Sequence, residues 1–271
     1  MIRAYTLRDL STSAEFQTCH QLQIDTWGAS FSELVPVAIL RLAQRLGGVV
    51  AGAFDHTDQM VGFVFGLPGI ERGVPVHWSD MLAVRADARN QGLGEALKRH
   101  QRAVLLERGV QRMYWTFDPL EAKNAYFNFV RLGIIVREYA RNLYGNSDSP
   151  LHRGIGTDRL IAIWELSSPR VIGRLAHDES PVRPALRMVN PRIAVGDAER
   201  CAPPVFVDEP AVGIAIPRDI HALKEQHPTV ARDWRQHTRA AFEHYLSRGY
   251  VVTDFTRAAD GVSYVLEEFD Q

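Results

Sequence analysis

The 271-residue sequence is poor in cysteine, in net charge and in long apolar runs, and each scarcity excludes a class of protein. Only two cysteines occur, Cys19 and Cys201, far apart and outside any ligand-like spacing. A disulfide framework and a thiolate metal site are therefore not expected. We predict two free thiols and no metal.

Charge is nearly balanced, with 31 basic and 32 acidic side chains and a formal net charge of -1. Because no surplus of positive charge is available for phosphates or an anionic bilayer, neither nucleic acid nor a membrane is an expected partner. No stretch approaches the roughly 18 apolar residues of a membrane helix, and residues 1–9 carry charges where a signal peptide is apolar. We expect a cytoplasmic protein.

What the sequence does contain is typical of a soluble globular chain, with 46% hydrophobic and 23% charged residues. Its length suits one large core and a smaller second unit. Eight of the prolines fall within 169–217, which indicates a boundary. The predicted parts are a domain over 1–168, a proline-rich irregular segment over 169–204, and a strand-helix-hairpin unit over 205–271. That last unit would cover the acceptor site, form a homodimer or add strands to the main sheet.

Apolar periodicity predicts a mixed α/β order. Helices are expected over 13–27, 33–46, 92–108, 120–132 and 229–248. Strands are expected over 2–7, 49–54, 60–67, 76–84, 111–117, 134–139, 159–166, 212–216, 250–255 and 262–267. In the helix over 92–108, Leu93 and Leu97 keep to the apolar face, whereas Lys98 lies outside it.

The segment Arg89–Gly94, Arg-Asn-Gln-Gly-Leu-Gly, lies between a predicted strand and a predicted helix. Glycines there let the backbone turn tightly and expose consecutive N–H groups at the positive end of a helix, an arrangement suited to phosphates. No Gly-Lys-Ser/Thr follows, and the three-glycine dinucleotide spacing is missing. A phosphate-binding turn of another kind is indicated, with a simple helix start as the alternative.

The unit Met81–Gly94 resembles the central motif of the GNAT superfamily of N-acetyltransferases, a strand, then R/Q-x-x-G-x-G/A, then a helix. Arg131–Ile134 is similar to the turn that closes the family's next motif. The resemblance covers about residues 1–166. Trp115–Leu120 and Tyr144-Gly145, with Asn124-Ala125, look like a bacterial subgroup known only as predicted acetyltransferases. The resemblance to the superfamily implies the GNAT fold, an α/β fold with a mixed, mostly antiparallel sheet flanked by helices. In this chain a smaller α+β unit is expected to follow it.

The resemblance also implies acetyl-CoA or another acyl-CoA as co-substrate. The strand backbone would pair with the pantetheine arm in a gap between two strands, and the turn's N–H groups would hold the pyrophosphate. The cofactor-binding residues implied in this way are Leu82, Ala83, Val84, Arg89, Asn90, Gln91, Gly92, Leu93 and Gly94. The family's helix asparagine would stand at Ala122 here, and Asn124, two residues on, is the residue expected to reach the cofactor in its place.

The expected chemistry is direct attack of an amine on the thioester, with proton transfer at both ends. Asp80, just before the cofactor-pairing segment, is the expected base, and His77, on the other face of that strand, is a weaker second choice. In many members of the family, a tyrosine at the position of Phe129 acts as the acid that protonates the departing thiolate. Tyr126 or Tyr144 is the expected substitute.

The sequence thus predicts an enzyme that moves an acetyl group, or a succinyl or other acyl group, from coenzyme A to the amine of a small molecule such as an amino acid. The alternative is a GNAT-like scaffold that binds coenzyme A or acyl-CoA as a sensor or interaction module without turnover.

Overall fold

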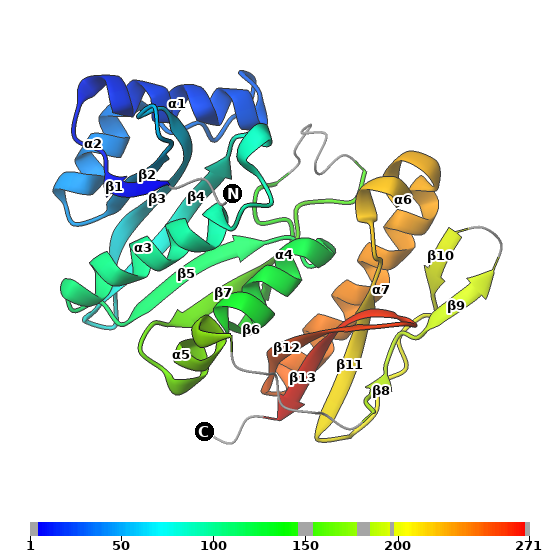
Figure 1. Cartoon of the computed structure of the whole chain (residues 1–271). Helices are drawn as coiled ribbons and strands as arrows, with labels where there is room; N and C mark the ends of the chain where they lie inside the picture. Colours follow the sequence, from blue (N-terminus) through cyan, green and yellow to red (C-terminus); the bar gives the residue numbers. More distant parts are fainter. Residues whose placement is uncertain (1–4, 146–153, 178–184, 196–197, 269–271) are drawn as a thin grey trace. The chain divides into compact units, whose positions relative to one another are not determined.

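The protein has a mixed α/β fold of two compact units (Figure 1). The computed structural model describes residues 5–145, 154–177, 185–195 and 198–268. The first unit comprises residues 1–115 and 165–167, and the second comprises residues 116–164 and 168–271. This α/β architecture is the one predicted from the sequence.

The first unit is built on a sheet of β1 to β5 in sequential order (Figure 1). Its strands are β1 (Thr6–Asp9), β2 (Val49–Phe54), β3 (Met60–Glu71), β4 (Val74–Val84) and β5 (Arg112–Phe117), of which residues up to Trp115 belong to this unit. The pairs among β1 to β4 are antiparallel, and β4 pairs with β5 in parallel.

Helices cover both faces of this sheet. They are α1 (Ser13–Trp27), α2 (Val37–Arg45) and α3 (Leu93–Glu107), with a short 3-10 turn at Ala86–Ala88. Phe63 belongs to the core that α1 and α2 form with the sheet. Its neighbour Gly62 faces α3, because a Cβ there would lie 3.4 Å from Leu97 Cδ1. Successive strand residues point to opposite faces, so α3 covers the face opposite α1 and α2.

Local sequence explains where these elements begin and end. Thr12 and Glu15 form a capping box that starts α1 at the predicted residue. The helix expected from residue 33 begins only at Val37, because Pro36 disfavours helical backbone at the residue before it. Strand β3 continues past Pro68 to Glu71, although the sequence suggested a turn there. The register with β2 ends at Gly66, so Pro68 lacks no hydrogen bond on that side.

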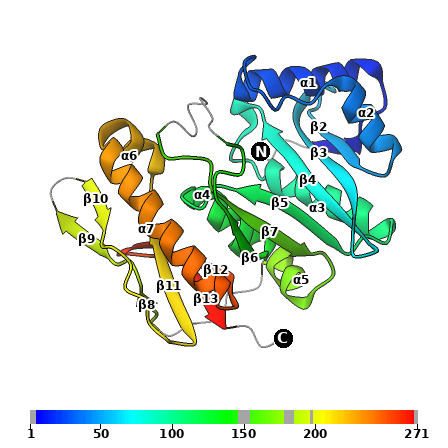
Figure 2. The same cartoon turned by 180° about the vertical axis from the view of Figure 1, so that it is seen from behind.

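The sheet strands of the second unit follow the order β7-β6-β12-β13-β11-β8 (Figure 2). Its strands are β6 (Ile135–Ala140), β7 (Arg159–Glu165), β8 (Arg187–Met188), β11 (Ala211–Ile216), β12 (Tyr250–Ala258) and β13 (Gly261–Glu268), beside a separate hairpin of β9 (Arg192–Val195) and β10 (Ala198–Cys201). Its helical segments are α4 (Ala122–Tyr126), a π-helix (Phe127–Leu132), α5 (Pro169–Ala176), α6 (Ile220–Gln226) and α7 (Pro228–Ser247).

The C-terminal part of the chain extends the sheet that β6 and β7 begin. Strand β12 pairs with β6 at Val252 and Val136, and β13, β11 and β8 follow outward. Of the three roles expected for this part, the addition of strands is the one found. Across the described residues of both units, no helix combines the length and apolarity needed to cross a membrane.

Aromatic side chains join this addition to the preceding segment. Tyr264 of β13 lies 5.7 Å from Phe129, 5.2 Å from Phe242 and 5.1 Å from Phe255 between ring centroids. Its hydroxyl donates to the carbonyl of Pro119 at 2.7 Å. Phe129 is therefore a core residue of the second unit.

Candidate functional site

Strands β4 and β5 form a fork in the first unit. Their register consists of two pairs, His77 with Met113 and Trp78 with Tyr114. Beyond that point β4 continues to Val84 in register with β3. The last six residues of β4 therefore keep an edge that faces away from β3 and is not paired with β5.

The direction of the backbone groups on this edge follows from one hydrogen bond. The N–H of Arg85 donates to the carbonyl of Val61 at 2.8 Å and so faces β3. Because successive strand residues direct their N–H and C=O groups to opposite sides, Ala83 also faces β3. Leu82 and Val84 face the fork. The carbonyl of Val84 accepts a hydrogen bond from Arg89 Nε at 3.0 Å.

The turn after β4 has the backbone that an anion cradle requires. Asn90 has φ 61° and Gly92 has φ 79°, and helix α3 begins at Leu93 without a side-chain cap from any described residue. The amides of its first turn have no partner inside the helix. A Cβ added to Gly94 would meet only Leu82 Cδ2 at 3.8 Å, so the space beside this glycine is open.

Side chains hold the turn in shape. Arg85 forms an ion pair with Asp87 at 2.7 Å across the 3-10 turn. Gln91 accepts a hydrogen bond from Tyr5 Oη at 2.7 Å and donates to the carbonyl of Asp87 at 3.3 Å. Arg89, Asn90, Gln91 and Gly92 are exposed. The residues of the turn are therefore accessible to solvent, while these side-chain contacts fix the conformation of its backbone.

Asp80, the predicted base, is the extra residue of a bulge in β4. The register with β3 shifts between Ser79, opposite Gly66, and Met81, opposite Phe65. Asp80 is exposed, yet burial of its carboxyl raises its pKa above the ordinary value, and a hydrogen bond from Trp78 opposes this rise. A raised pKa brings a carboxylate closer to the basicity that proton abstraction needs.

A chain of buried polar side chains lies on the α3 side of the fork. Lys98 Nζ donates to Ser79 Oγ at 2.8 Å, and Ser79 donates to Gln101 Oε1 at 3.0 Å. Gln101 Nε2 lies 3.0 Å from His77 Nε2. The amide must donate there, because its oxygen already accepts from Ser79. The proton of His77 is then on Nδ1, which has no partner among the described residues.

Burial sets the charge of this chain. Burial lowers the pKa of Lys98 to about 7, and Lys98 Nζ lies 3.8 Å from the ring centroid of Trp115. Burial, reinforced by the charges of Lys98 and Arg108, lowers the pKa of His77 to about 3. His77 is therefore neutral and fully buried, which is unsuited to the role of an accessible base. The prediction that Lys98 lies off the packed face of its helix is wrong, since only 4% of it is exposed.

Three further predicted site residues lie in the second unit. Tyr126 of α4 is half-buried, and the guanidinium carbon of Arg257 lies 3.8 Å from its ring centroid. Tyr144 shares a hydrogen bond of 2.8 Å with Thr116 Oγ1. Asn124 is exposed on α4.

Asp118 has a structural partner that sequence reasoning missed. It caps the next turn by accepting from the N–H of Leu120 at 2.8 Å. Both of its oxygens also accept from Arg235 Nη2, at 2.8 and 2.7 Å, and Arg235 is 2% exposed. The two residues are 117 positions apart, and no local pattern pairs them.

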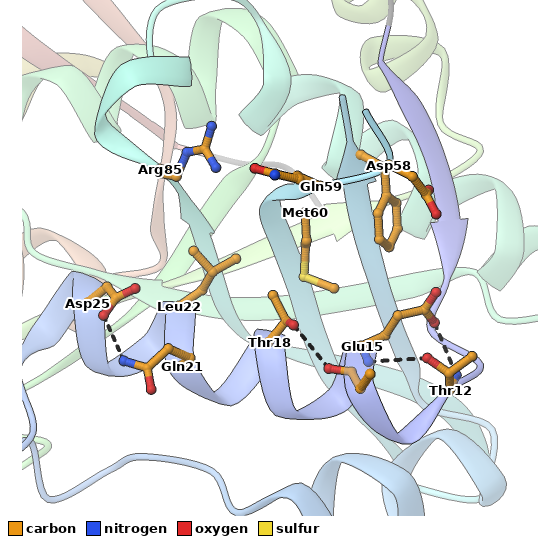
Figure 3. Close-up of a pocket in the computed structure, with 12 residues that line it drawn as sticks. Thr12, Glu15, Thr18, Gln21, Leu22, Asp25, Asp58, Gln59, Met60 and Arg85 are labelled. Carbon is orange, nitrogen blue, oxygen red and sulfur yellow. Dashed lines mark hydrogen bonds between the residues drawn. The ribbon is translucent and has the colours of Figure 1, made fainter. Parts of the chain in front are cut away.

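A separate cavity of about 610 Å³ opens in the first unit between α1 and the turn that joins β2 to β3 (Figure 3). Asp25 and Glu15 of α1, Asp58 of the β2–β3 turn and Arg85 are among its charged lining residues. Figure 3 shows Arg85 across the cavity from α1, which bears Asp25 beside Gln21. Arg8 pairs with Glu15 at 2.6 Å and with Asp58 at 3.2 Å, which leaves the wall a small excess of negative charge.

Comparison with known proteins agrees with this architecture. Residues 11–133 match the model of the acetyltransferase (GNAT) family. A candidate acetyltransferase from Acinetobacter baylyi ADP1 has a TM-score of 0.51 at 16% identity, over 62% of this chain and 94% of its own. That likeness shows a shared fold.

Two further solved structures are similar to a comparable share of the chain. The ribosomal-protein-S18-alanine N-acetyltransferase from Escherichia coli has a TM-score of 0.47 and 18% identity, over 61% of this chain and 96% of its own. A candidate acetyltransferase from Salmonella typhimurium with its cofactor acetyl-CoA has a TM-score of 0.49 and 15% identity, over 61% and 95%. No curated protein matches the sequence.

Proposed function

We propose that this chain, which carries an acetyltransferase domain of the GNAT family over residues 11–133, is an acyl-CoA-dependent N-acyltransferase. The donor carries an acetyl group, or a succinyl or other acyl group, and the acceptor is the amine of a small molecule such as an amino acid. One observation carries the proposal. The free edge of β4 leads directly into a turn whose amides open the helix α3.

Coenzyme A fits this arrangement in both of its polar parts. Its pyrophosphate suits the amides from Asn90 to Gly94, where the helix dipole favours negative charge. Its pantetheine amides suit the backbone groups of Leu82 and Val84, which face the fork. Arg89 gives up its bond to Val84 when the arm binds. The backbone of Ala83 pairs with Phe63 of β3, so Ala83 spaces Leu82 and Val84 along the strand and forms no hydrogen bond to the pantetheine arm.

The acceptor amine is deprotonated by Asp80, exposed at the bulge beside this edge. Asp25, in the lining of the cavity along α1, attracts a cationic acceptor before it loses its proton. Tyr126, Tyr144 and Asn124 remain predicted contributors from the second unit. A strand N–H at the fork polarises the thioester carbonyl during attack.

Gly94→Leu tests the cradle. The site beside Gly94 is open and its backbone is helical, so leucine is expected to preserve folding and to raise helix propensity by roughly 0.5–1 kcal/mol. The added side chain fills the space that the pyrophosphate needs, so coenzyme A binding is expected to disappear in calorimetry. The matched control Ala103→Leu, at an exposed position of the same helix, retains binding.

Turnover is measured as release of free thiol from acetyl-CoA and succinyl-CoA in the presence of a panel of amino acids and polyamines. Amine-dependent thiol release by the intact protein supports the enzyme. Binding of coenzyme A without any amine-dependent release favours the sensor alternative, and absence of binding by the intact protein refutes the proposal.

A further inference from the structure

Lys98 lies where β4 and β5 part. The last paired residues are Trp78 and Tyr114, so the first residues beyond the fork point are Ser79 and Trp115. Lys98 contacts both of them, Ser79 through a hydrogen bond of 2.8 Å and Trp115 at 3.8 Å from the ring centroid. Its amine therefore forms the floor of the fork, on the side of the sheet that α3 covers.

The free edge of β4 leads from the phosphate turn to this amine. From Val84 back to Ser79 the strand covers about 16 Å at roughly 3.3 Å per residue. A phosphopantetheine arm anchored at the turn and lying along Val84 and Leu82 therefore points its sulfur end at the fork. This inference rests on the proposed function, because it takes acyl-CoA as the ligand of the edge.

Among the residues that the structure describes, none supplies this amine with an anionic partner. Its hydrogen bond goes to a neutral hydroxyl and its other contact is an aromatic face. A buried cation is costly unless it is paired, and here the hydrogen-bonded chain through Ser79 and Gln101 ends at the neutral ring of His77. An anionic group on a bound ligand would compensate the charge of this buried ammonium.

We propose that Lys98 supplies the proton taken up by the departing thiolate when the thioester is cleaved at the fork. The acceptor nitrogen forms a bond to the acyl carbon, the carbon–sulfur bond breaks, and sulfur keeps the electron pair. The proton passes from Lys98 Nζ to sulfur and leaves a neutral amine. The acceptor's own proton leaves through Asp80 to water, and Lys98 recovers a proton from water.

The environment supports this role. Burial lowers the pKa of Lys98 to about 7, so the amine gives up a proton far more readily than an exposed lysine does. The titratable groups on the packed strands do not compete for that proton near neutral pH. Burial keeps His77 neutral with a pKa of about 3, Asp80 is exposed, and Tyr114 donates its hydroxyl to Glu71 at 2.6 Å.

The decisive measurement needs no acceptor. The thiol of bound coenzyme A is titrated by its thiolate absorbance in the intact protein, in Lys98→Met and in the matched control Arg99→Met. The control removes the neighbouring positive charge of the same helix, whose guanidinium pairs with Glu95 at 2.8 Å. A thiolate beside Lys98 keeps the amine protonated as an ion pair, so the thiol is expected to ionise at least about one pH unit lower in the intact protein and in Arg99→Met than in Lys98→Met.

Turnover gives the second readout. Lys98→Met is expected to lower kcat on the order of a hundredfold with little change in the KM for acyl-CoA. The rate of the intact protein is expected to fall with rising pH as Lys98 loses its proton, and the variant is expected to lack this fall. Should Lys98→Met not fold, Ser79→Ala replaces it. Without the Ser79 hydroxyl, the Lys98 amine loses the hydrogen bond that positions it. The pKa of the coenzyme A thiol is therefore expected to rise relative to the intact protein, as in Lys98→Met.

The outcomes separate the two proposals. If the intact protein does not bind coenzyme A, the proposed function itself fails. If it binds coenzyme A but the thiol titrates alike in the intact protein and the Lys98 or Ser79 variant, Lys98 is a packing residue and the inference is overturned.

Discussion

At the scale of single residues, Lys98 shows what hydrophobic periodicity leaves out. A lysine on a helix is expected in solvent, and nothing adjacent in the sequence indicates that β4 and β5 enclose its amine. The glycine turn is the opposite case. Gly92 requires φ 79°, a backbone that favours glycine, and its spacing to Gly94 made the turn recognisable from sequence alone.

The lowered pKa of Lys98 predicts a pH-dependent stability. Between about pH 7 and the ordinary value of 10.5, the unfolded chain holds a proton that the folded chain has released. Stability should therefore rise with pH through this window, by up to about 1.4 kcal/mol per pH unit, relative to Lys98→Met. Urea unfolding of both proteins at several pH values between 7 and 9 measures the difference. Parallel pH profiles would contradict it.

The buried pair of Asp118 and Arg235 makes a second residue-scale prediction. Asp118→Ala leaves the guanidinium of Arg235, 2% exposed, without its carboxylate. We expect a loss of roughly 3–5 kcal/mol in the free energy of unfolding, because an uncompensated buried charge is costly. The double variant Asp118→Ala, Arg235→Met is expected to recover part of the loss in the same denaturant experiment. A single variant within 1 kcal/mol of the intact protein, on the order of a surface substitution, would refute this account.

At the scale of elements, helix α1 depends on its capping box. Thr12→Ala removes the oxygen that accepts from the N–H of Glu15 at 3.2 Å and should cost about 1 kcal/mol of stability. Thr12→Ser keeps the oxygen and serves as the control. Urea unfolding compares the three proteins, and an equal loss in both variants would show that the methyl group, rather than the cap, is responsible.

Elements whose ends are determined by nearby residues could be predicted from the sequence. Elements whose ends depend on contacts with distant segments could not. The capping box located α1, and the glycine turn located the start of α3. Helix α6 has only seven residues, too few for a periodic pattern, although Asp219 caps it by accepting from the N–H groups of His221 and Ala222. The fork could be expected only through resemblance, because a strand's sequence does not state where its neighbour leaves it.

At the scale of the whole molecule, the C-terminal part is an integral piece of the second unit. It supplies Arg235 to Asp118, Tyr264 to Phe129 and the strand beside β6. A boundary near residue 168 was predicted from the proline-rich composition that follows. The structure explains why composition alone says little there, since contacts between distant positions hold the second unit together.

Truncation after residue 168 tests this dependence. The shortened chain exposes Phe129, removes Arg235 from Asp118 and leaves β6 without β12, so we expect aggregation rather than a folded monomer. Size-exclusion chromatography with light scattering measures the outcome. A monomeric product with cooperative unfolding would show that residues 1–168 fold unaided. A chain ending at residue 268 is the control.

The fork is also a hazard of self-association. A strand edge with unpaired N–H and C=O groups is the template on which foreign strands add, and enzymes that keep one open for a ligand must guard it. Here Arg89 bonds the carbonyl of Val84 at the mouth of the fork, and a guanidinium is a group that incoming strands avoid. The side chain that coenzyme A would displace in our proposal thus also protects this edge of the protein from strands of its own copies.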